Sequence, residues 1–149
     1  MFKHLIGSAS EKVKNSIELG AVRKFAEAIG DPNPLFIDEE TGLRSRYKRN
    51  LAPPTFPVTL NYGTIGGLKL PSKGLIHGEQ SFHYEKPLLV GDTVYCSSKL
   101  VNYRERTGSV GNMGMMTIER MGETKDGELL FTMKQVVIIT EAVRKVMSV

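Results

Sequence analysis

The second half of the chain reads as a series of strands separated by short turns, and this pattern constrains the fold more than any other feature of the sequence. Residues 75–86, 93–103, 108–121 and 129–140 show the alternation and the β-branched or apolar content of strands. The last two runs are joined by a turn-rich segment, Gly122-Glu123-Thr124-Lys125-Asp126-Gly127. Short turns join antiparallel neighbours, because a parallel pair needs a long crossover. The sequence therefore predicts an antiparallel meander.

The first half is helical and rich in loops. Glu18 to Ile29 has apolar residues at intervals of three and four, which predicts an amphipathic helix that ends at Gly30. A shorter, polar helical stretch is expected around residues 38–47. The segment from Phe56 to Leu68 is mostly apolar but contains three glycines, so a helix there makes sense only when it is buried and closely packed. One long apolar helix wrapped by an antiparallel sheet buries both, which is an α+β arrangement.

A stiff polar loop follows the first expected helix, with the sequence Gly30-Asp31-Pro32-Asn33-Pro34-Leu35-Phe36. Pro32 and Pro34 fix their own φ, and each disfavours the helical conformation for the residue before it. The side chains of Asp31 and Asn33 are therefore expected on a rigid backbone, as a binding or proton-transfer site requires. The structural alternative is that Asp31 caps the turn and Asn33 hydrogen-bonds to its own backbone.

This loop resembles the signature Gly-Asp-x-Asn-Pro-(apolar)-His of the (R)-specific enoyl hydratases and MaoC-like dehydratases. Residues 52–57, Ala-Pro-Pro-Thr-Phe-Pro, and residues 77–93 are similar to the amino-terminal MaoC-like dehydratase domains. That branch includes subunits of mycobacterial-type (3R)-hydroxyacyl carrier-protein dehydratases. The resemblance extends over nearly the whole chain, and it implies one hot-dog domain over residues 1–149, in which the antiparallel sheet wraps around a central helix.

The resemblance implies a (3R)-hydroxyacyl-thioester dehydratase or trans-2-enoyl-thioester hydratase, a hydro-lyase, or a subunit of one. In such a site Asp31 orients or activates the water, and Asn33 helps to hold its partner or the substrate. The motif histidine, however, is replaced by Phe36, which neither donates nor accepts a proton. Two interpretations stay open. Either another group, in this chain or another subunit, replaces the histidine, or the chain is a non-catalytic acyl-thioester-binding subunit that needs a catalytic partner.

Two histidines are candidates for the missing acid/base group. His77 and His83 are an even number of residues apart, so in an unbroken strand they face the same, polar side, whereas Phe82 faces the expected helix. A bulge near Gly78 would reverse this direction for His77 alone. His77 is therefore the third predicted catalytic residue beside Asp31 and Asn33.

The predicted substrate-binding residues are Phe36, Thr55, Phe56 and Gly63. The resemblance implies that a glycine amide near the start of the central helix stabilises the charge that develops on the thioester carbonyl, and Gly63 is the nearest match. Phe36 would line an acyl tunnel. A thioesterase shares this fold but usually needs a carboxylate on or near the central helix. Because residues 55–68 contain no Asp or Glu, thioester hydrolysis is the less favoured reading.

The composition limits the kinds of ligand and partner that the chain is expected to bind. The net charge is +4, and the only basic cluster is Arg44-Ser45-Arg46-Tyr47-Lys48-Arg49. This cluster suits coenzyme A or an acyl carrier protein, with a solvated helix end as the alternative. The single cysteine, Cys96, is expected to be a packing residue, and we expect no metal and no cofactor. No apolar run approaches the roughly 20 residues that cross a bilayer, so we expect a cytoplasmic protein with no membrane or nucleic-acid partner.

The expected fold also predicts that the chain pairs with a second hot-dog chain. A hot-dog unit leaves one edge strand unpaired, and an unpaired edge invites a second chain. We therefore expect a homodimer, or a heterodimer with another hot-dog subunit. The candidate boundary segments are Thr93 to Tyr103 and the run Met113-Gly114-Met115-Met116.

Overall fold

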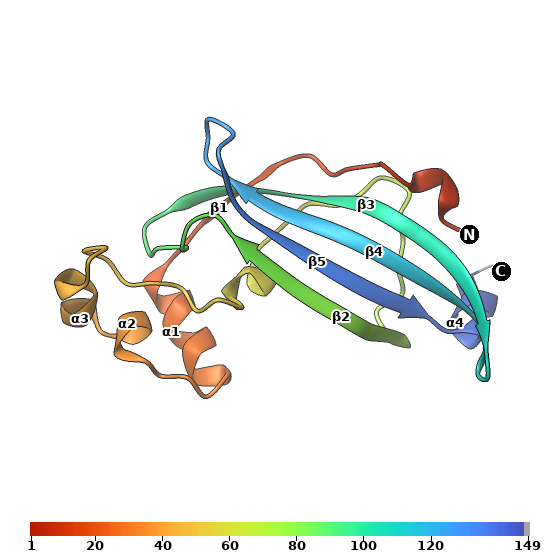
Figure 1. Ribbon diagram of the computed structural model, residues 1–149, viewed down its shortest axis with the longest axis horizontal. Helices are drawn as coiled ribbons and strands as arrows, with labels where there is room; N and C mark the ends of the chain where they lie inside the picture. Colours follow the sequence, from red (N-terminus) through yellow and green to blue (C-terminus); the bar gives the residue numbers. More distant parts are fainter. Residues whose placement is uncertain (148–149) are drawn as a thin grey trace.

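A five-stranded antiparallel sheet forms the body of the molecule in the computed structural model, which describes residues 1–147 (Figure 1). The strand order is β1-β3-β4-β5-β2. The strands are β1 (Val13–Ser16), β2 (Leu75–Tyr84), β3 (Thr93–Gly108), β4 (Gly111–Glu123) and β5 (Leu129–Ile139). The four strands that the sequence predicts are confirmed, with β3 longer than expected, whereas the short strand β1 was not predicted.

The helices gather at the two ends of the sheet. At one end lie α1 (Leu19–Ala28), α2 (Pro34–Ile37) and α3 (Glu39–Arg44); at the other lie the N-terminus and α4 (Glu141–Met147) (Figure 1). The helices expected near residues 18–29 and 38–47 are therefore confirmed as α1 and α3, and α4 was not predicted. Among residues 1–147, none of the helices has the length and apolar character needed to cross a membrane.

The long helix expected from Phe56 to Leu68 is wrong. Only a 3-10 turn, η2 (Phe56–Thr59), forms there, and an irregular segment follows it. Pro57 has no N–H to donate, and Gly63 and Gly67 have φ of +69° and +79°, outside the helical region. Glycine density therefore breaks this helix rather than letting it pack closely.

One face of the sheet is buried, and we call it the inner face. It carries two separate apolar clusters. The first core lies toward α1–α3 and consists of Ile17, Val22, Ala26, Phe36, Ala52, Phe56, Tyr62, Leu88, Val94, Cys96, Leu130, Phe131 and Met133. The second core lies toward the N-terminus and α4 and consists of Phe2, Ile65, Leu100, Tyr103, Met116, Ile118, Val137 and Ile139. The irregular segment after η2 contributes to both, through Tyr62 and Ile65.

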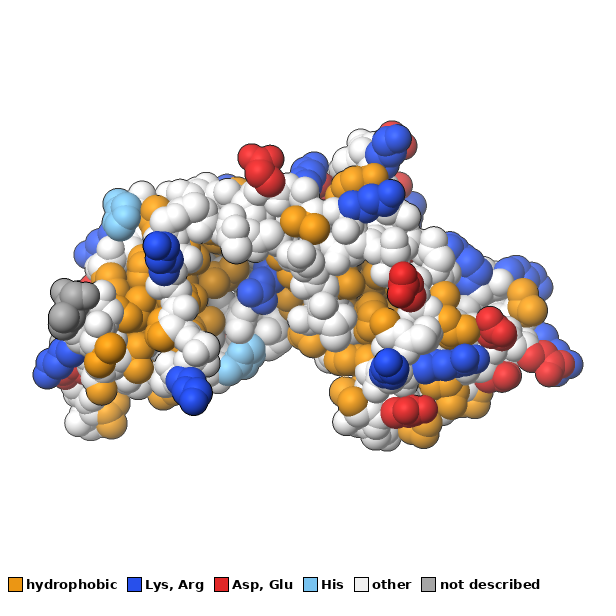
Figure 2. Space-filling model, turned by 180° about the vertical axis from the view of Figure 1, so that it is seen from behind, with side chains coloured by type: hydrophobic (Ala, Val, Ile, Leu, Met, Phe, Trp, Pro, Cys, Tyr) orange, Lys and Arg blue, Asp and Glu red, His pale blue; other side chains and the backbone are white. Residues whose placement is uncertain are grey.

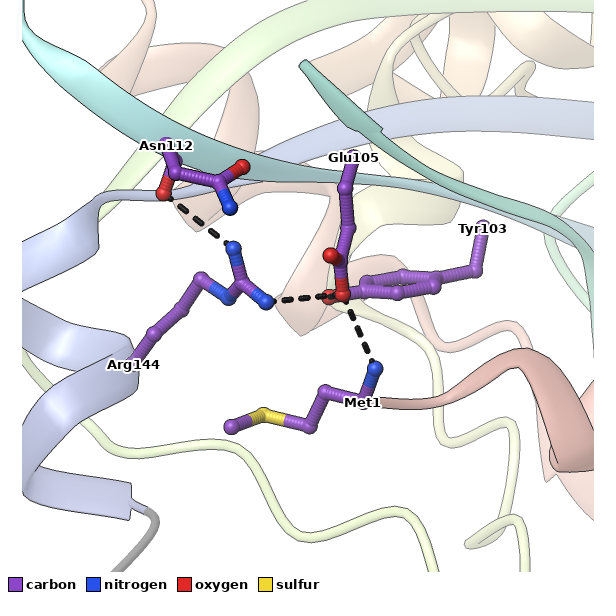
Figure 3. Close-up of polar contacts among 5 residues, drawn as sticks. All are labelled: Met1, Tyr103, Glu105, Asn112 and Arg144. Carbon is purple, nitrogen blue, oxygen red and sulfur yellow. Dashed lines mark hydrogen bonds and ion pairs between the residues drawn. The ribbon is translucent and has the colours of Figure 1, made fainter. Parts of the chain in front are cut away.

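A group of polar contacts fastens both ends of the described chain to the hairpin of β3 and β4 (Figure 3). Glu105 Oε1 accepts from the amine of Met1 at 3.0 Å and from the hydroxyl of Tyr103 at 3.2 Å. The same oxygen is paired with Arg144 Nη2 at 2.7 Å, and Arg144 Nη1 donates to the carbonyl of Asn112. The hydrogen bond from the terminal amine is the main cause that lowers the pKa of Glu105 below its usual value, with a further contribution from Arg144.

Candidate functional site

The motif loop is held by its own backbone. The amide of Gly30 donates to the carbonyl of Glu27 and that of Asp31 to the carbonyl of Ala26, with Gly30 at φ +70°. This pair of bonds is the Schellman arrangement that ends a helix at glycine. The stop predicted at Gly30 is therefore confirmed, and it fixes where the following polar residues start.

The two polar residues of this loop lie on the surface. Asn33 Oδ1 accepts from the amide of Leu35 at 3.0 Å, so Asn33 is the N-cap of α2, with Pro34 at the first helical position. Asp31 is exposed, and no hydrogen bond or ion pair of its side chain is found within residues 1–147. A carboxylate without a partner is not held in one orientation. The structural role considered for Asn33 is confirmed, whereas the catalytic roles of both residues stay predictions.

Phe36, at the position of the motif histidine, belongs to the first core. Its side chain is 9% exposed, on α2. It also forms part of the wall of a cavity of about 430 Å³, lined by Leu35, Phe36, Leu51, Ala52, Pro54, Tyr84, Glu85, Lys86, Pro87 and Leu88. Most of this lining is apolar. Phe36 therefore borders an apolar cavity, and its substrate-binding role stays a prediction.

The cavity is closed on one side by residues with fixed positions. Tyr84 donates its hydroxyl to the carbonyl of Pro54 at 2.7 Å, and burial raises the pKa of this tyrosine. Phe56 is buried beside the cavity residues of the first core, and its ring meets that of Phe25 edge to face at 5.5 Å. Thr55 is exposed at the start of η2 and does not line the cavity. The walls are thus mostly apolar, with the charged side chains of Glu85 and Lys86 as the exceptions.

Gly63 lies in a tight approach to the N-terminal segment. A Cβ on this residue would lie 2.9 Å from the carbonyl oxygen of Glu11. Its amide donates to Asn61 Oδ1 at 3.0 Å. That amide already has an acceptor, so it is not free to stabilise a thioester oxyanion in this conformation. The substrate-binding role of Gly63 remains a prediction, and the close packing explains the glycine without it.

His77 lies on the inner face because β2 has a bulge at Gly78. The pairing with β5 shifts between His77 and Glu79, so His77 lies opposite Val137 and Gln80 opposite Gln135. Val137 is part of the second core, so His77 points to the inner face of the sheet, although its own side chain is exposed there. The bulge considered from the sequence is confirmed. His83, beyond the bulge, is paired with Glu85 on the exposed face, as predicted.

The structure does not bring His77 to Asp31. His77 is the third residue of β2, and β2 begins at the end of the sheet away from α1–α3 and the motif loop (Figure 1). Within residues 1–147 no hydrogen bond or ion pair joins the two side chains, and the partner of His77 is Gln135 instead. A catalytic pair of Asp31 and His77 within one chain is therefore not formed.

Two residues that the sequence reading missed accompany His77. Arg120 Nη1 on β4 donates to Gln135 Oε1 at 2.9 Å, and Gln135 Nε2 lies 3.1 Å from His77 Nδ1. The guanidinium also lies over the ring of Tyr62, with 5.4 Å between Cζ and the ring centroid. Burial lowers the pKa of Arg120. The available signal was strand alternation, which puts Arg120 in phase with the apolar residues Met116 and Ile118.

The remaining candidates have structural explanations. Cys96 is fully buried in the first core, and burial raises the pKa of its thiol to about 12, so the expected packing role is confirmed. In the basic cluster, Arg44 pairs with Glu40, and Arg49 pairs with Asp92 at 2.9 Å. No three His, Cys, Asp or Glu side chains within residues 1–147 are placed to hold a metal ion.

A five-stranded antiparallel sheet with helices at its ends and an apolar cavity beside the motif loop define an α+β protein, and comparison with known proteins assigns its family. Residues 4–133 match the FAS1-like, dehydratase domain region family. A UPF0336 protein from Thermobifida fusca (strain YX) is 33% identical over 124 residues, which are 79% of this chain and 79% of that protein. The chain therefore belongs to this family of MaoC-like hot-dog dehydratases.

Solved structures confirm the hot-dog fold. The C-terminally truncated HadBC (3R-hydroxyacyl-ACP dehydratase) complex from Mycobacterium tuberculosis superposes with a TM-score of 0.78 at 21% identity, over 93% of this chain and 99% of that one. The ChsH1-ChsH2 complex from the same organism gives a TM-score of 0.72 at 17% identity, over 89% of this chain and 84% of that one. At these identities the likeness concerns the fold alone.

Proposed function

We propose that this chain is the acyl-binding subunit of a two-chain MaoC-like dehydratase, which acts on (3R)-hydroxyacyl or trans-2-enoyl thioesters of coenzyme A or an acyl carrier protein. A second hot-dog chain with a complete motif supplies the acid/base pair. The observation that carries the proposal is Phe36. It takes the place of the motif histidine, is buried in the first core and forms part of the cavity wall. A phenyl ring can bind an acyl chain but transfers no proton.

The other polar residues of the motif also support a binding role for this chain and a catalytic role for its partner. Asp31 is exposed and Asn33 is used as a helix cap, so neither is held toward a reacting group. The one histidine on the inner face within residues 1–147, His77, is at the far end of β2. A general acid or base must lie within hydrogen-bond reach of the proton that it transfers. The two structural relatives named above are both described as complexes of two different chains, which fits a chain that needs a partner.

The edge for that partner is β2. Within the described residues β2 pairs only with β5, so its other side has unpaired backbone groups, and Ile76 on this strand is 49% exposed. The boundary segments expected from the sequence, Thr93 to Tyr103 and Met113 to Met116, stay predictions. The run from Met113 to Met116 lies in β4, an interior strand, and the first part of β3 is covered by β1. An edge strand of ten residues is long enough to continue the sheet into a second chain.

The test is hydration of a crotonyl thioester, followed by the loss of enoyl absorbance. We expect no turnover by this chain alone and turnover when it is mixed with a hot-dog chain of the same genome that carries Asp-x-Asn-Pro-x-His. The mixture is expected to exceed the partner alone. Phe36→His is expected to leave the single chain inactive, with Phe36→Leu as its matched control, because the new imidazole lacks an oriented carboxylate. Turnover by the wild-type chain alone would contradict the proposal.

A further inference from the structure

A row of polar side chains crosses the inner face between the two apolar cores. It consists of Ser98 on β3, Arg120 on β4, Gln135 on β5, and Gln80 and His77 on β2. Ser98 lies opposite Arg120 and Gln80 opposite Gln135, while hydrogen bonds join Arg120 to Gln135 and Gln135 to His77. Gln135 lies between Met133 of the first core and Val137 of the second. Figure 2 shows this side of the molecule hollowed between two apolar areas, with a basic side chain inside the hollow and a histidine at its rim. A small cavity of about 170 Å³ adjoins the row, lined by Leu75, Ile76, His77, Gln135 and Val137.

The hydrogen bonds of this row fix which groups point into the hollow. A guanidinium only donates, so the amide oxygen of Gln135 faces Arg120 and the NH₂ group faces His77. Nδ1 of His77 therefore accepts, and the proton of the neutral ring is on Nε2. On Arg120 and His77 the groups left over are the other N–H groups of the guanidinium and the Nε2–H of the imidazole, all of which are donors. These two side chains therefore suit an acceptor.

The charge of Arg120 has no carboxylate partner in the part of the chain that the structure describes. Its contacts are the amide of Gln135 and the ring of Tyr62. The ring cannot move away, because the Tyr62 hydroxyl donates to the carbonyl of Pro57 at 2.6 Å and its own carbonyl accepts from Ser10. A half-buried cation with an incomplete set of partners is costly to the fold. Such a residue is explained when an anion binds it.

We propose that the hollow binds a carboxylate attached to an apolar chain. Arg120 pairs with the carboxylate, His77 donates to it from Nε2, and the chain lies against the apolar side chains of the neighbouring cores. Arginine suits this role because its planar fork matches the two carboxylate oxygens. The ligand class is a fatty monocarboxylate. If the proposed function holds, on which this extension rests, the subunit selects acyl thioesters that carry an anionic group on the acyl chain.

Binding to the single chain, with no hydration step, tests this site independently of the proposed function. The probes are octanoate, octanol and acetate, measured by calorimetry and by the amide signals of the Gln135 side chain in NMR. Octanoate is expected to bind at least tenfold more tightly than either of the others, since only it has both the charge and the chain. Equal binding of octanol and octanoate, or no binding of octanoate, would overturn the proposal.

Three variants locate the binding. Arg120→Met is expected to weaken octanoate binding at least tenfold, while the melting temperature of the protein stays equal or rises. Gln135→Glu keeps the size of the side chain but places a carboxylate against Arg120, so it is expected to weaken octanoate binding by the same factor. If Arg120→Met does not fold, Gln135→Glu tests the site in its place. Arg106→Met, which removes an exposed charge from β3, is the control and should bind as the wild type does. Unchanged octanoate affinity in Arg120→Met or in folded Gln135→Glu refutes the site.

Discussion

Replacing Phe36 by alanine tests whether the residue at the histidine position is part of the core. Full burial of a phenylalanine is worth about 3–5 kcal/mol in Phe→Ala changes. Phe36 is 9% exposed and borders a cavity of about 430 Å³, so part of its surface already lacks packing partners. We therefore expect a loss of about 2–4 kcal/mol in the free energy of unfolding. At about 2–4 °C per kcal/mol, a loss of about 3 kcal/mol lowers the melting temperature by about 6–12 °C.

Urea unfolding followed by circular dichroism measures this loss directly. The control is Leu43→Ala, because Leu43 is 63% exposed on α3 and should change stability by no more than about 0.5 kcal/mol. A loss below about 1 kcal/mol for Phe36→Ala would show that the ring is not packed as described. The motif loop would then be free to move, and the assignment of Phe36 to a structural wall would fail.

Two further changes have outcomes set by the structure. Gly122→Ala places a Cβ 2.3 Å from a ring carbon of the fully buried Phe131, so we expect the free energy of unfolding, measured by thermal unfolding, to fall by about 2 kcal/mol or more. Gly20→Ala is the matched control, because Gly20 lies on α1 with open space around it, and this change should stabilise the protein by about 0.5–1 kcal/mol. Similar stability of the two variants would contradict the packing. The pKa of Glu105 is lower in the folded state than its usual value of 4.5. The carboxylate therefore stabilises the fold fully at a pH above 4.5, and this stabilisation is lost as the pH falls through the pKa of the folded state. Glu105→Gln should therefore be less stable at pH 7 and lose less stability on acidification; parallel pH curves would refute this.

Local signals predicted much of the fold. The 3–4 spacing of α1 and the glycine that follows it placed the helix and its Schellman end, and the turn residues separated β4 from β5. Alternation in an unbroken strand placed His77 on the polar face, and the glycine beside it offered, as the alternative, the bulge that turns His77 to the inner face. These features depend on residues close together in the sequence.

The failures depend on tertiary context. Apolar content from Phe56 to Leu68 suggested a helix, but the segment is apolar because it crosses both cores, and its glycines adopt positive φ. Arg120 and Gln135 were missed because a search for acid/base motifs passes over an arginine and an amide. Their significance comes from the hydrogen bond that joins them as diagonal neighbours on β4 and β5, which no single strand reveals.

In the proposed complex this chain supplies binding surface while its partner supplies the acid/base pair. Asp31→Asn in the reconstituted two-chain complex separates these two roles, with the initial rate of crotonyl thioester hydration as the measurement. Because Asp31 is exposed and without a partner in the described structure, we expect the rate to change by less than about threefold. Removing a general acid or base typically costs about 10²- to 10⁴-fold, so a fall of that size would contradict the account and make Asp31 catalytic.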